Sequence, residues 1–167
     1  MTDTARRGVH HIGLGTHDME ATLRFYEGVL GFPARVCELI EPEAGGVIRH
    51  AFLDVGEGEL IAFMECNGVT GVQEDFDPGI NRGLGIQGGL IHFAFKACGL
   101  EELERRRAEL LEKTVNVSEI VDHGWCKSIY FKDPNGLQLE FCCLAEELGD
   151  VHIETRGGEA WKRWARD

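Results

Sequence analysis

The sequence predicts an α+β fold built from two copies of a βαβββ module, and three observations support that prediction. Runs typical of a strand, a helix and three further strands follow one another in the first half of the chain, and the same order returns in the second half. An offset of 81 residues superposes the segment HIGL at His11 on the segment HFAF at His92. Each half also contains strand-like runs joined by a turn that carries glycine. A repeat of this length indicates two copies of one structural unit.

The first module is expected at residues 9–66, after a polar arm at 1–8. Residues 9–14 read as a short strand. Asp18 is typical of a helix N-cap, and apolar residues then recur at helical spacing until Gly31 ends the helix. Three more strands are predicted at 34–40, 48–55 and 59–65.

The second module is expected at residues 90–145, separated from the first by a connector at 67–89. The connector is rich in glycine and acidic residues, and it is long for a loop inside a compact domain. The predicted elements of the second module are a strand at 90–95, a helix at 100–113, a strand at 116–122 and hairpin strands at 128–131 and 137–141. In the tail at 146–167, Trp161 and Trp164 lie three residues apart, which predicts a short amphipathic helix.

The hairpin of the second module is the clearest local signal in the chain. Its turn, DPNG at 133–136, combines a proline that presets one backbone angle with a glycine that permits a positive φ. Side chains alternate along a strand, so Leu139 and Phe141 share one face and Glu140 lies on the other. Glu140 is therefore expected to point away from the apolar layer.

Composition limits the classes of function. The chain has 167 residues, an apolar fraction of 43% and a formal charge of −12, which disfavours binding to nucleic acid or to an anionic membrane. It contains no apolar run of the roughly 20 residues that a membrane helix needs, and no secretory signal, so a cytoplasmic location is expected. The six cysteines form no CxxC pair and are interpreted as buried hydrophobic residues or unreactive thiols.

The repeat groups four residues that would be unremarkable alone: His11, Glu65, His92 and Glu140. Each module offers a histidine from its first strand and a glutamate from its last. Two imidazoles and two carboxylates suit a divalent metal such as Zn²⁺, Ni²⁺, Co²⁺, Mn²⁺ or Fe²⁺. His11 rather than His10 is chosen because only His11 matches the sequence frame of His92. The sequence therefore predicts a metal site, with a structural role for each residue as the alternative.

Two further residues are candidates for catalysis. Tyr130 lies on a hairpin strand, where its hydroxyl could orient a substrate oxygen or the ring could simply be half-buried. His123 precedes Gly124 in a predicted loop, where it could transfer a proton or be an exposed loop histidine. Both alternatives stay open for each residue.

Three segments resemble the vicinal oxygen chelate superfamily, which includes glyoxalase I, extradiol dioxygenases and bleomycin-binding proteins. They are HHIGLGTHDMEATLRFYEGVLGF near the start, GGLIHFAF in the middle and SIYFKDPNGLQLEF near the end. The resemblance implies that the modules form a curled, cup-shaped mixed β-sheet with helices outside and a metal inside the cup. It also implies a homodimer that acts on a small-molecule substrate.

The resemblance implies three alternative functions. A glyoxalase-type lyase or isomerase would use His11, Glu65, His92 and Glu140 to hold a metal that stabilises an enolate or similar oxyanion, with Glu65 or Glu140 moving a proton. An Fe(II) extradiol-type dioxygenase would use His11, His92 and Glu140, with Tyr130 lining the pocket and Glu65 spare. A bleomycin-resistance type of protein would bind a small molecule or antibiotic without metal.

Overall fold

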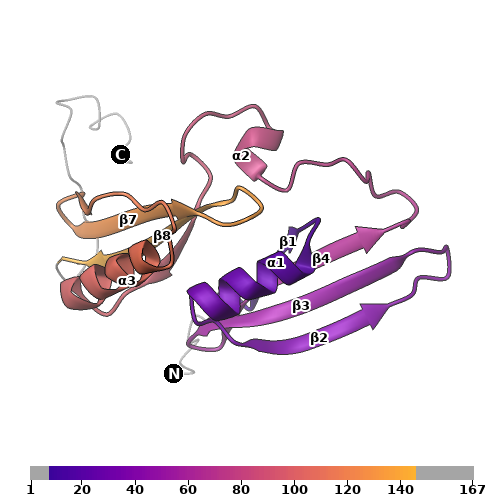
Figure 1. Cartoon of the computed structure of the whole chain (residues 1–167), viewed down its shortest axis with the longest axis horizontal. Coiled ribbons are helices and arrows are strands. Elements are labelled where there is room, and N and C mark those ends of the chain that lie inside the picture. The colour runs from indigo at the N-terminus through magenta and orange to yellow at the C-terminus, as the bar shows by residue number, and fades with distance from the viewer. Residues whose placement is uncertain (1–7, 146–167) are drawn as a thin grey trace, which may run out of the picture.

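The computed structural model describes residues 8–145 and confirms the predicted α+β fold (Figure 1). It contains two four-stranded sheets, which we name sheet A and sheet B. Sheet A, in the order β1-β4-β3-β2, comprises β1 (His11–Gly15), β2 (Ala34–Ile40), β3 (Val47–Gly56) and β4 (Glu59–Asn67). Sheet B, in the order β5-β8-β7-β6, comprises β5 (Phe93–Lys96), β6 (Val121–Asp122), β7 (Cys126–Lys132) and β8 (Gln138–Leu144). The helix predicted around Trp161 and Trp164 lies outside the described residues.

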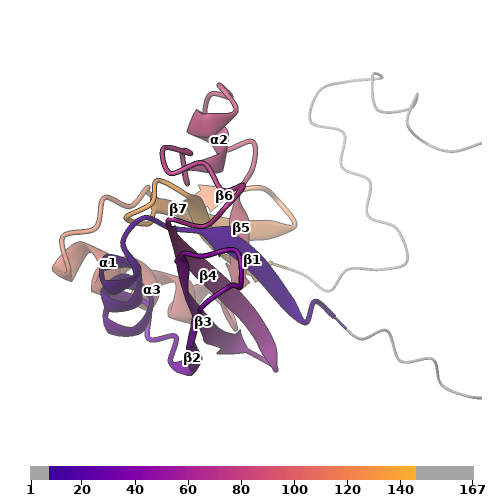
Figure 2. The ribbon, with the colours of Figure 1, turned by 90° about the vertical axis from the view of Figure 1, so that its right-hand side faces the viewer.

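The helical segments are α1 (Met19–Leu23), η1 (Arg24–Val29), α2 (Ile80–Gly83) and α3 (Leu100–Glu112). Helices α1 and α3 lie on the same side of the sheets in Figure 2, whereas the short helix α2 lies at the top of that view. Arg106 on α3 donates from Nη1 to the Leu30 carbonyl at 2.9 Å, and Lys113 donates from Nζ to the Gly28 carbonyl at 2.7 Å. These bonds hold α3 beside η1. In the described part of the chain, no helix has the length and apolar character needed to span a membrane.

The two sheets share one topology. The first strand of each sheet pairs in parallel with the last, and the other neighbours are antiparallel. The sheets stay open and do not close into barrels. Because directly paired residues point to the same side, each sheet has a helix face, which packs against helices, and an open face opposite it. Phe63 marks the helix face of sheet A, since its ring lies 4.8 Å from that of Tyr26.

The first helix follows the sequence prediction at both ends. Asp18 caps α1, with its Oδ1 accepting a hydrogen bond from the Ala21 amide at 2.8 Å. Gly31 ends the helical segment with a φ of +76°, which glycine adopts without strain. The middle differs from the prediction, because the helix widens into the π-helical turn η1, where the Leu30 amide donates to the Phe25 carbonyl at 3.0 Å.

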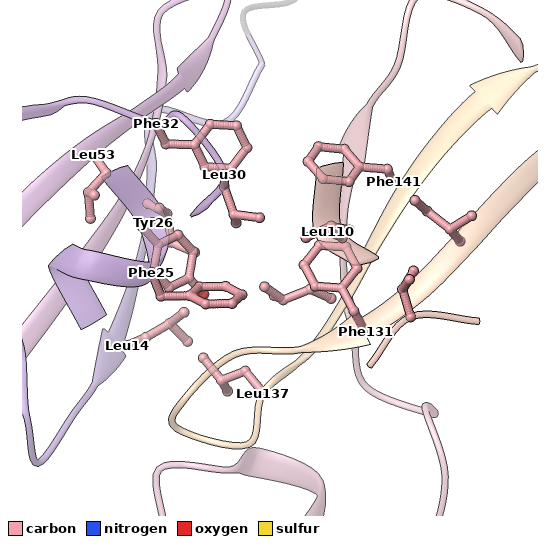
Figure 3. Packing of buried hydrophobic residues seen from close by; sticks show 14 of the residues in the cluster. Leu14, Phe25, Tyr26, Leu30, Phe32, Leu53, Leu110, Phe131, Leu137 and Phe141 are labelled. Atoms are coloured by element: carbon pink, nitrogen blue, oxygen red, sulfur yellow. The ribbon is translucent and has the colours of Figure 1, made fainter. Parts of the chain in front are cut away.

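The hydrophobic core lies between the two sheets and is shared by both halves of the chain (Figure 3). Phe25 and Leu30 from the first half point toward Phe131 and Phe141 from the second (Figure 3). The Phe131 and Phe141 rings stack at a centroid distance of 5.5 Å, and Phe141 is 2% exposed. Replacing such a side chain by alanine typically costs about 3–5 kcal/mol, so the two halves stabilise one another.

A buried polar network also joins the halves at the hairpin turn. Tyr26 donates its hydroxyl hydrogen to Asp133 Oδ2 at 3.2 Å, and Asn135 donates from Nδ2 to the same oxygen at 2.9 Å. Thr16 in turn donates to Asn135 Oδ1 at 2.7 Å. Burial raises the pKa of the Asp133 carboxyl, although hydrogen bonds from Asn135 and the Leu137 amide act in the opposite direction. The predicted turn is confirmed, and its polar residues serve the packing of the two halves.

Two strands of the second half are shorter than predicted. The strand expected from residue 90 begins at Phe93, because Asn81 donates from Nδ2 to the Ile91 carbonyl at 2.6 Å and accepts from the Ile91 amide at 3.0 Å. These bonds use the backbone groups that a neighbouring strand would otherwise pair. The strand expected at 116–122 is reduced to β6, because the Ser118 hydroxyl accepts from the Tyr130 amide at 3.0 Å and replaces a backbone carbonyl there.

Candidate functional site

The open face of sheet B collects polar side chains around Glu140. Leu139 and Phe141 face the core, so Glu140 lies on the opposite face, as the alternation predicts. The strand register places Tyr130 and Ala94 directly beside Glu140 on the same face. Glu140 is only 5% exposed, so its carboxylate is held in a protected position.

His92 and Glu140 form the central pair of this site. His92 Nε2 lies 3.0 Å from Glu140 Oε2, and His92 Nδ1 lies 2.7 Å from the carbonyl oxygen of Gly89. A carbonyl oxygen can only accept a hydrogen bond, so Nδ1 carries a proton and Nε2 turns toward the carboxylate. Nε2 of His92 and Oε2 of Glu140 therefore face each other. The second carboxylate oxygen, Oε1, accepts from the Ser128 hydroxyl at 2.5 Å.

This pair fits a divalent metal. A backbone carbonyl on Nδ1–H is the arrangement that orients a metal-binding histidine with Nε2 toward the ion. A metal binds the deprotonated forms of its ligands, and His92 through Nε2 and Glu140 through Oε2 would supply two of them. His92 and Glu140 are thus brought together as predicted.

Tyr130 and His123 form a second pair beside the first. The Tyr130 hydroxyl lies 2.9 Å from His123 Nε2, and the Tyr130 ring meets the His92 ring edge-on at a centroid distance of 6.2 Å. Burial raises the pKa of the Tyr130 phenol, and the charge of Glu140 acts in the same direction. Tyr130 is therefore a neutral hydrogen-bond donor at neutral pH. The structure places both catalytic candidates at this site.

Two cysteines complete the surroundings of Glu140. Ser128 pairs directly with Cys142 across the sheet, and Cys126 lies on the same face. Burial, followed by a hydrogen bond with Cys142, raises the pKa of the Cys126 thiol to about 11. Cys126 therefore stays protonated, and it is buried as predicted, as is Cys143, whereas Cys37 and Cys98 are exposed.

His11 lies on the open face of sheet A, and within residues 8–145 it is not grouped with His92 and Glu140. It pairs with Leu60, and its ring contacts Phe52 edge-on at a centroid distance of 5.5 Å. Its Nδ1 lies 2.8 Å from Nδ1 of His10. His11 is exposed. Its imidazole is therefore accessible from solvent, as a ligand site requires.

The predicted equivalence of Glu65 and Glu140 is wrong. Ala94 pairs with Glu140 in sheet B, and the corresponding Gly13 pairs with Ala62 in sheet A, so Ala62 occupies the place of Glu140. Glu65 is three residues further on and faces the helices, where its Oε2 accepts from the Met19 amide at 2.8 Å. An odd separation along a strand reverses the face, and this puts Glu65 on the other side of the sheet from His11.

The predicted four-ligand set is accordingly not assembled. Among residues 8–145, no three histidine, cysteine or acidic side chains are grouped so as to hold a metal ion. The structure brings together His92 and Glu140, leaves His11 on its own sheet, and separates Glu65 from all three.

Sequence reasoning also missed several contributors to the site. Ser128 shares a face with Tyr130 by alternation, so its contact with Glu140 could have been inferred. The equivalence of Ala62 and Glu140 could also have been inferred from the sequence. Ala62 lies four residues after the turn glycine Gly58, and Glu140 lies four residues after the turn glycine Gly136. The Gly89 carbonyl carries no such signal, because it belongs to an irregular loop.

Comparison with known proteins gives consistent matches. The family model described as the Glyoxalase/Bleomycin resistance protein/Dioxygenase superfamily matches residues 8–141. An iron-dependent extradiol dioxygenase of Rhodococcus jostii (strain RHA1) is 28% identical over 167 residues, which cover 98% of this chain and 52% of that protein. The chain thus spans about half the length of that relative.

Two solved structures share the fold. The structure of SMU.1112c has a TM-score of 0.59 and 26% identity, covering 81% of this chain and 98% of that one. TnmS3, an antibiotic binding protein from Streptomyces sp. CB03234, has a TM-score of 0.59 and 16% identity, covering 84% of this chain and 98% of that one. At 16% identity the likeness to TnmS3 concerns the fold alone.

Proposed function

Because the chain belongs to the glyoxalase/bleomycin resistance protein/dioxygenase superfamily, we propose that it is a metal-dependent enzyme for a small substrate with vicinal oxygens. The observation that carries this proposal is the His92–Glu140 pair, with Nε2 and Oε2 3.0 Å apart and Nδ1 of His92 anchored on the Gly89 carbonyl. His92 and Glu140 are the proposed ligands on sheet B, and His11 is the proposed third ligand. Glu65 is not a ligand, because its carboxylate binds the start of α1.

We further propose that the metal is Fe(II) and that the reaction is oxygenation of the extradiol type. Two histidines and one carboxylate form the ligand set of many non-haem iron oxygenases, which leaves open positions for substrate and oxygen. A four-ligand set suited to lyase or isomerase chemistry would need Glu65 on the open face, where Ala62 stands. The named activity of the Rhodococcus jostii relative agrees with this choice, although this chain spans only about half of that protein.

When bound, the iron would supply Lewis acidity and electrons for oxygen chemistry. The residues of this chain would position the substrate and handle protons. The neutral Tyr130 hydroxyl can donate its single hydrogen to a substrate oxygen on the open face, while His123 Nε2–H, 2.9 Å away, donates to the phenol oxygen and orients it. Ser128 keeps the Glu140 carboxylate oriented through Oε1 and leaves Oε2 for the metal.

The third ligand is proposed to come from a second copy of the chain. The open face of sheet A carries His11 together with the exposed apolar side chains of Val36, Ile40 and Met64. A surface of this kind is typical of a protein contact. A homodimer that places this face over sheet B of the partner would cover the apolar residues and bring His11 to His92 and Glu140.

Metal content of anaerobically reconstituted protein tests the proposed function. We expect one iron per chain in the wild type and in Glu65→Gln, because glutamine still accepts from the Met19 amide and Glu65 is not a ligand. His92→Ala should lose the metal. Oxygen uptake with catechol as the probe should require iron and should fall in Tyr130→Phe with little change in iron content.

Two results would count against the proposal. Stoichiometric zinc or nickel that is lost in Glu65→Gln would restore the lyase or isomerase alternative with four ligands. A wild-type protein that takes up no metal under these conditions would indicate a metal-free binding protein.

A further inference from the structure

A cavity of about 450 Å³ lies next to the His92–Glu140 pair. One wall is the end of the connector, residues 81–89, and the other is the β7–β8 hairpin with Lys132, Gly136 and Gln138. The cavity adjoins the candidate site at two points. Gly89, which lines it, supplies the carbonyl that holds His92 Nδ1. Gln138 precedes Glu140 by two residues and lies on the same open face.

The charge of this cavity is opposite to that of the chain. The whole protein has a formal charge of −12, yet the charged residues that line the cavity are Arg82 and Lys132. Arg82 is held by Asp77 through two hydrogen bonds, at 2.5 and 2.6 Å. Lys132 is exposed, and within residues 8–145 its ammonium group has no ion pair or hydrogen bond. One lysine charge is therefore available to a ligand.

Close packing of the connector on the hairpin fixes the walls of the cavity. A Cβ atom on Gly136 would lie 2.8 Å from Arg82 Nη1, and one on Gly89 would lie 3.3 Å from Cγ of Gln138. The connector is thus packed directly on the hairpin at two glycines. Because a preformed site has less conformational entropy to lose on binding, this arrangement favours recognition of a small ligand.

We infer that this cavity binds an anionic group of the substrate, a carboxylate or a phosphate, through Lys132. The inference rests on the proposed function, because the vicinal oxygens of the same substrate would lie at His92 and Glu140. Lys132 and Tyr130 are two residues apart on one face of β7, a spacing of about 7 Å. A small organic anion can span this distance, so the preferred substrate is a negatively charged compound that carries two adjacent oxygens.

The test uses metal-free wild-type protein titrated with inorganic phosphate and, separately, with sodium acetate, at constant ionic strength. Backbone amide NMR signals of residues 85–89 report on binding. We expect saturable shifts in the wild type, a dissociation constant raised about tenfold in Lys132→Gln, and retention of binding in Lys132→Arg. Lys127→Gln is the matched control, because Lys127 lies on the same strand, faces the other side and pairs with Asp122.

Each outcome decides a separate point. Binding of phosphate alone assigns the cavity to a phosphate, and binding of acetate alone assigns it to a carboxylate. Absence of saturable shifts with either anion, or equal affinity in Lys132→Gln and Lys127→Gln, overturns the inference. If the protein binds the anion but takes up no metal, the anion site stands and the proposed metal-dependent function is rejected. If the protein binds one iron per chain but no anion, the proposed function stands and the anion site is rejected.

Discussion

At the scale of single residues, the orientation of the Glu140 carboxylate is set by two contacts, one to each of its oxygens. Ser128 binds Oε1 and His92 binds Oε2. Removing the Ser128 hydroxyl frees the carboxylate to rotate without changing a proposed ligand. We expect Ser128→Ala to lower iron affinity by about 10- to 100-fold, as found for partners that orient metal ligands.

Competition with a chelator of known affinity measures this effect. Ser118→Ala is the matched control, because the Ser118 hydroxyl binds the Tyr130 backbone and touches neither ligand. Equal iron affinity in Ser128→Ala and the wild type would contradict the role assigned to Ser128.

The cysteines allow a second prediction at this scale. The pKa of the Cys126 thiol is raised to about 11 by burial and by Cys142, so at pH 8 only about one molecule in a thousand carries the thiolate. Iodoacetamide should therefore modify the exposed Cys37 well before Cys126 in the folded protein. Peptide mapping by mass spectrometry provides the readout, and unfolded protein, in which both should react, is the control. If Cys126 is labelled as early as Cys37, the Cys126 thiol is accessible to solvent and the prediction is wrong.

At the scale of elements, the DPNG turn links the β7–β8 hairpin to the first helix, and this link should depend on pH. Burial raises the pKa of Asp133 above its ordinary value of 3.8, so the folded protein holds the proton more tightly than the unfolded chain. Stability from this group is complete below the unfolded pKa and is lost as pH rises through the folded pKa.

Urea denaturation of the wild type and Asp133→Asn at pH 4 and pH 7 tests this dependence. The free energy of unfolding of the wild type, relative to the variant, should decrease from pH 4 to pH 7. The constant cost of the altered hydrogen bonds cancels in this comparison. A difference that grows with pH would mean that the Asp133 pKa is lowered in the folded state.

The same elements show how far sequence alone could reach. The DPNG turn and the Asp18 cap were predicted correctly, because each depends on local backbone chemistry and is confirmed by its own hydrogen bonds. The His92–Glu140 contact followed from alternation and the repeat. The start of β5 could not be predicted, because it depends on Asn81, whose amide reaches Ile91 from another segment. The predicted equivalence of Glu65 and Glu140 was wrong because it rested on residue type alone. The distance from the turn glycine, which is four residues in both halves, identifies Ala62 as the equivalent of Glu140.

At the scale of the whole molecule, the proposed dimer makes a prediction about mixed subunits. Heterodimers of His11→Ala and His92→Ala chains, purified through two different tags, would contain one intact ligand set if His11 acts across the interface. We expect these heterodimers to hold about half of the wild-type iron, whereas each homodimeric variant holds none. If His11 instead serves its own chain, the heterodimers will bind no more iron than the homodimers.

The shared core has a consequence for the continuity of the chain. Phe25, Phe131 and Phe141 meet across the boundary between the halves, and Asn135 bonds to Thr16 from the far end of the sequence. The peptide link between the halves runs through the exposed segment 71–75. A protease that cuts there should therefore leave two fragments that migrate together on gel filtration and separate only in denaturant. In this respect the molecule would behave like a heterodimer that happens to be encoded as one polypeptide.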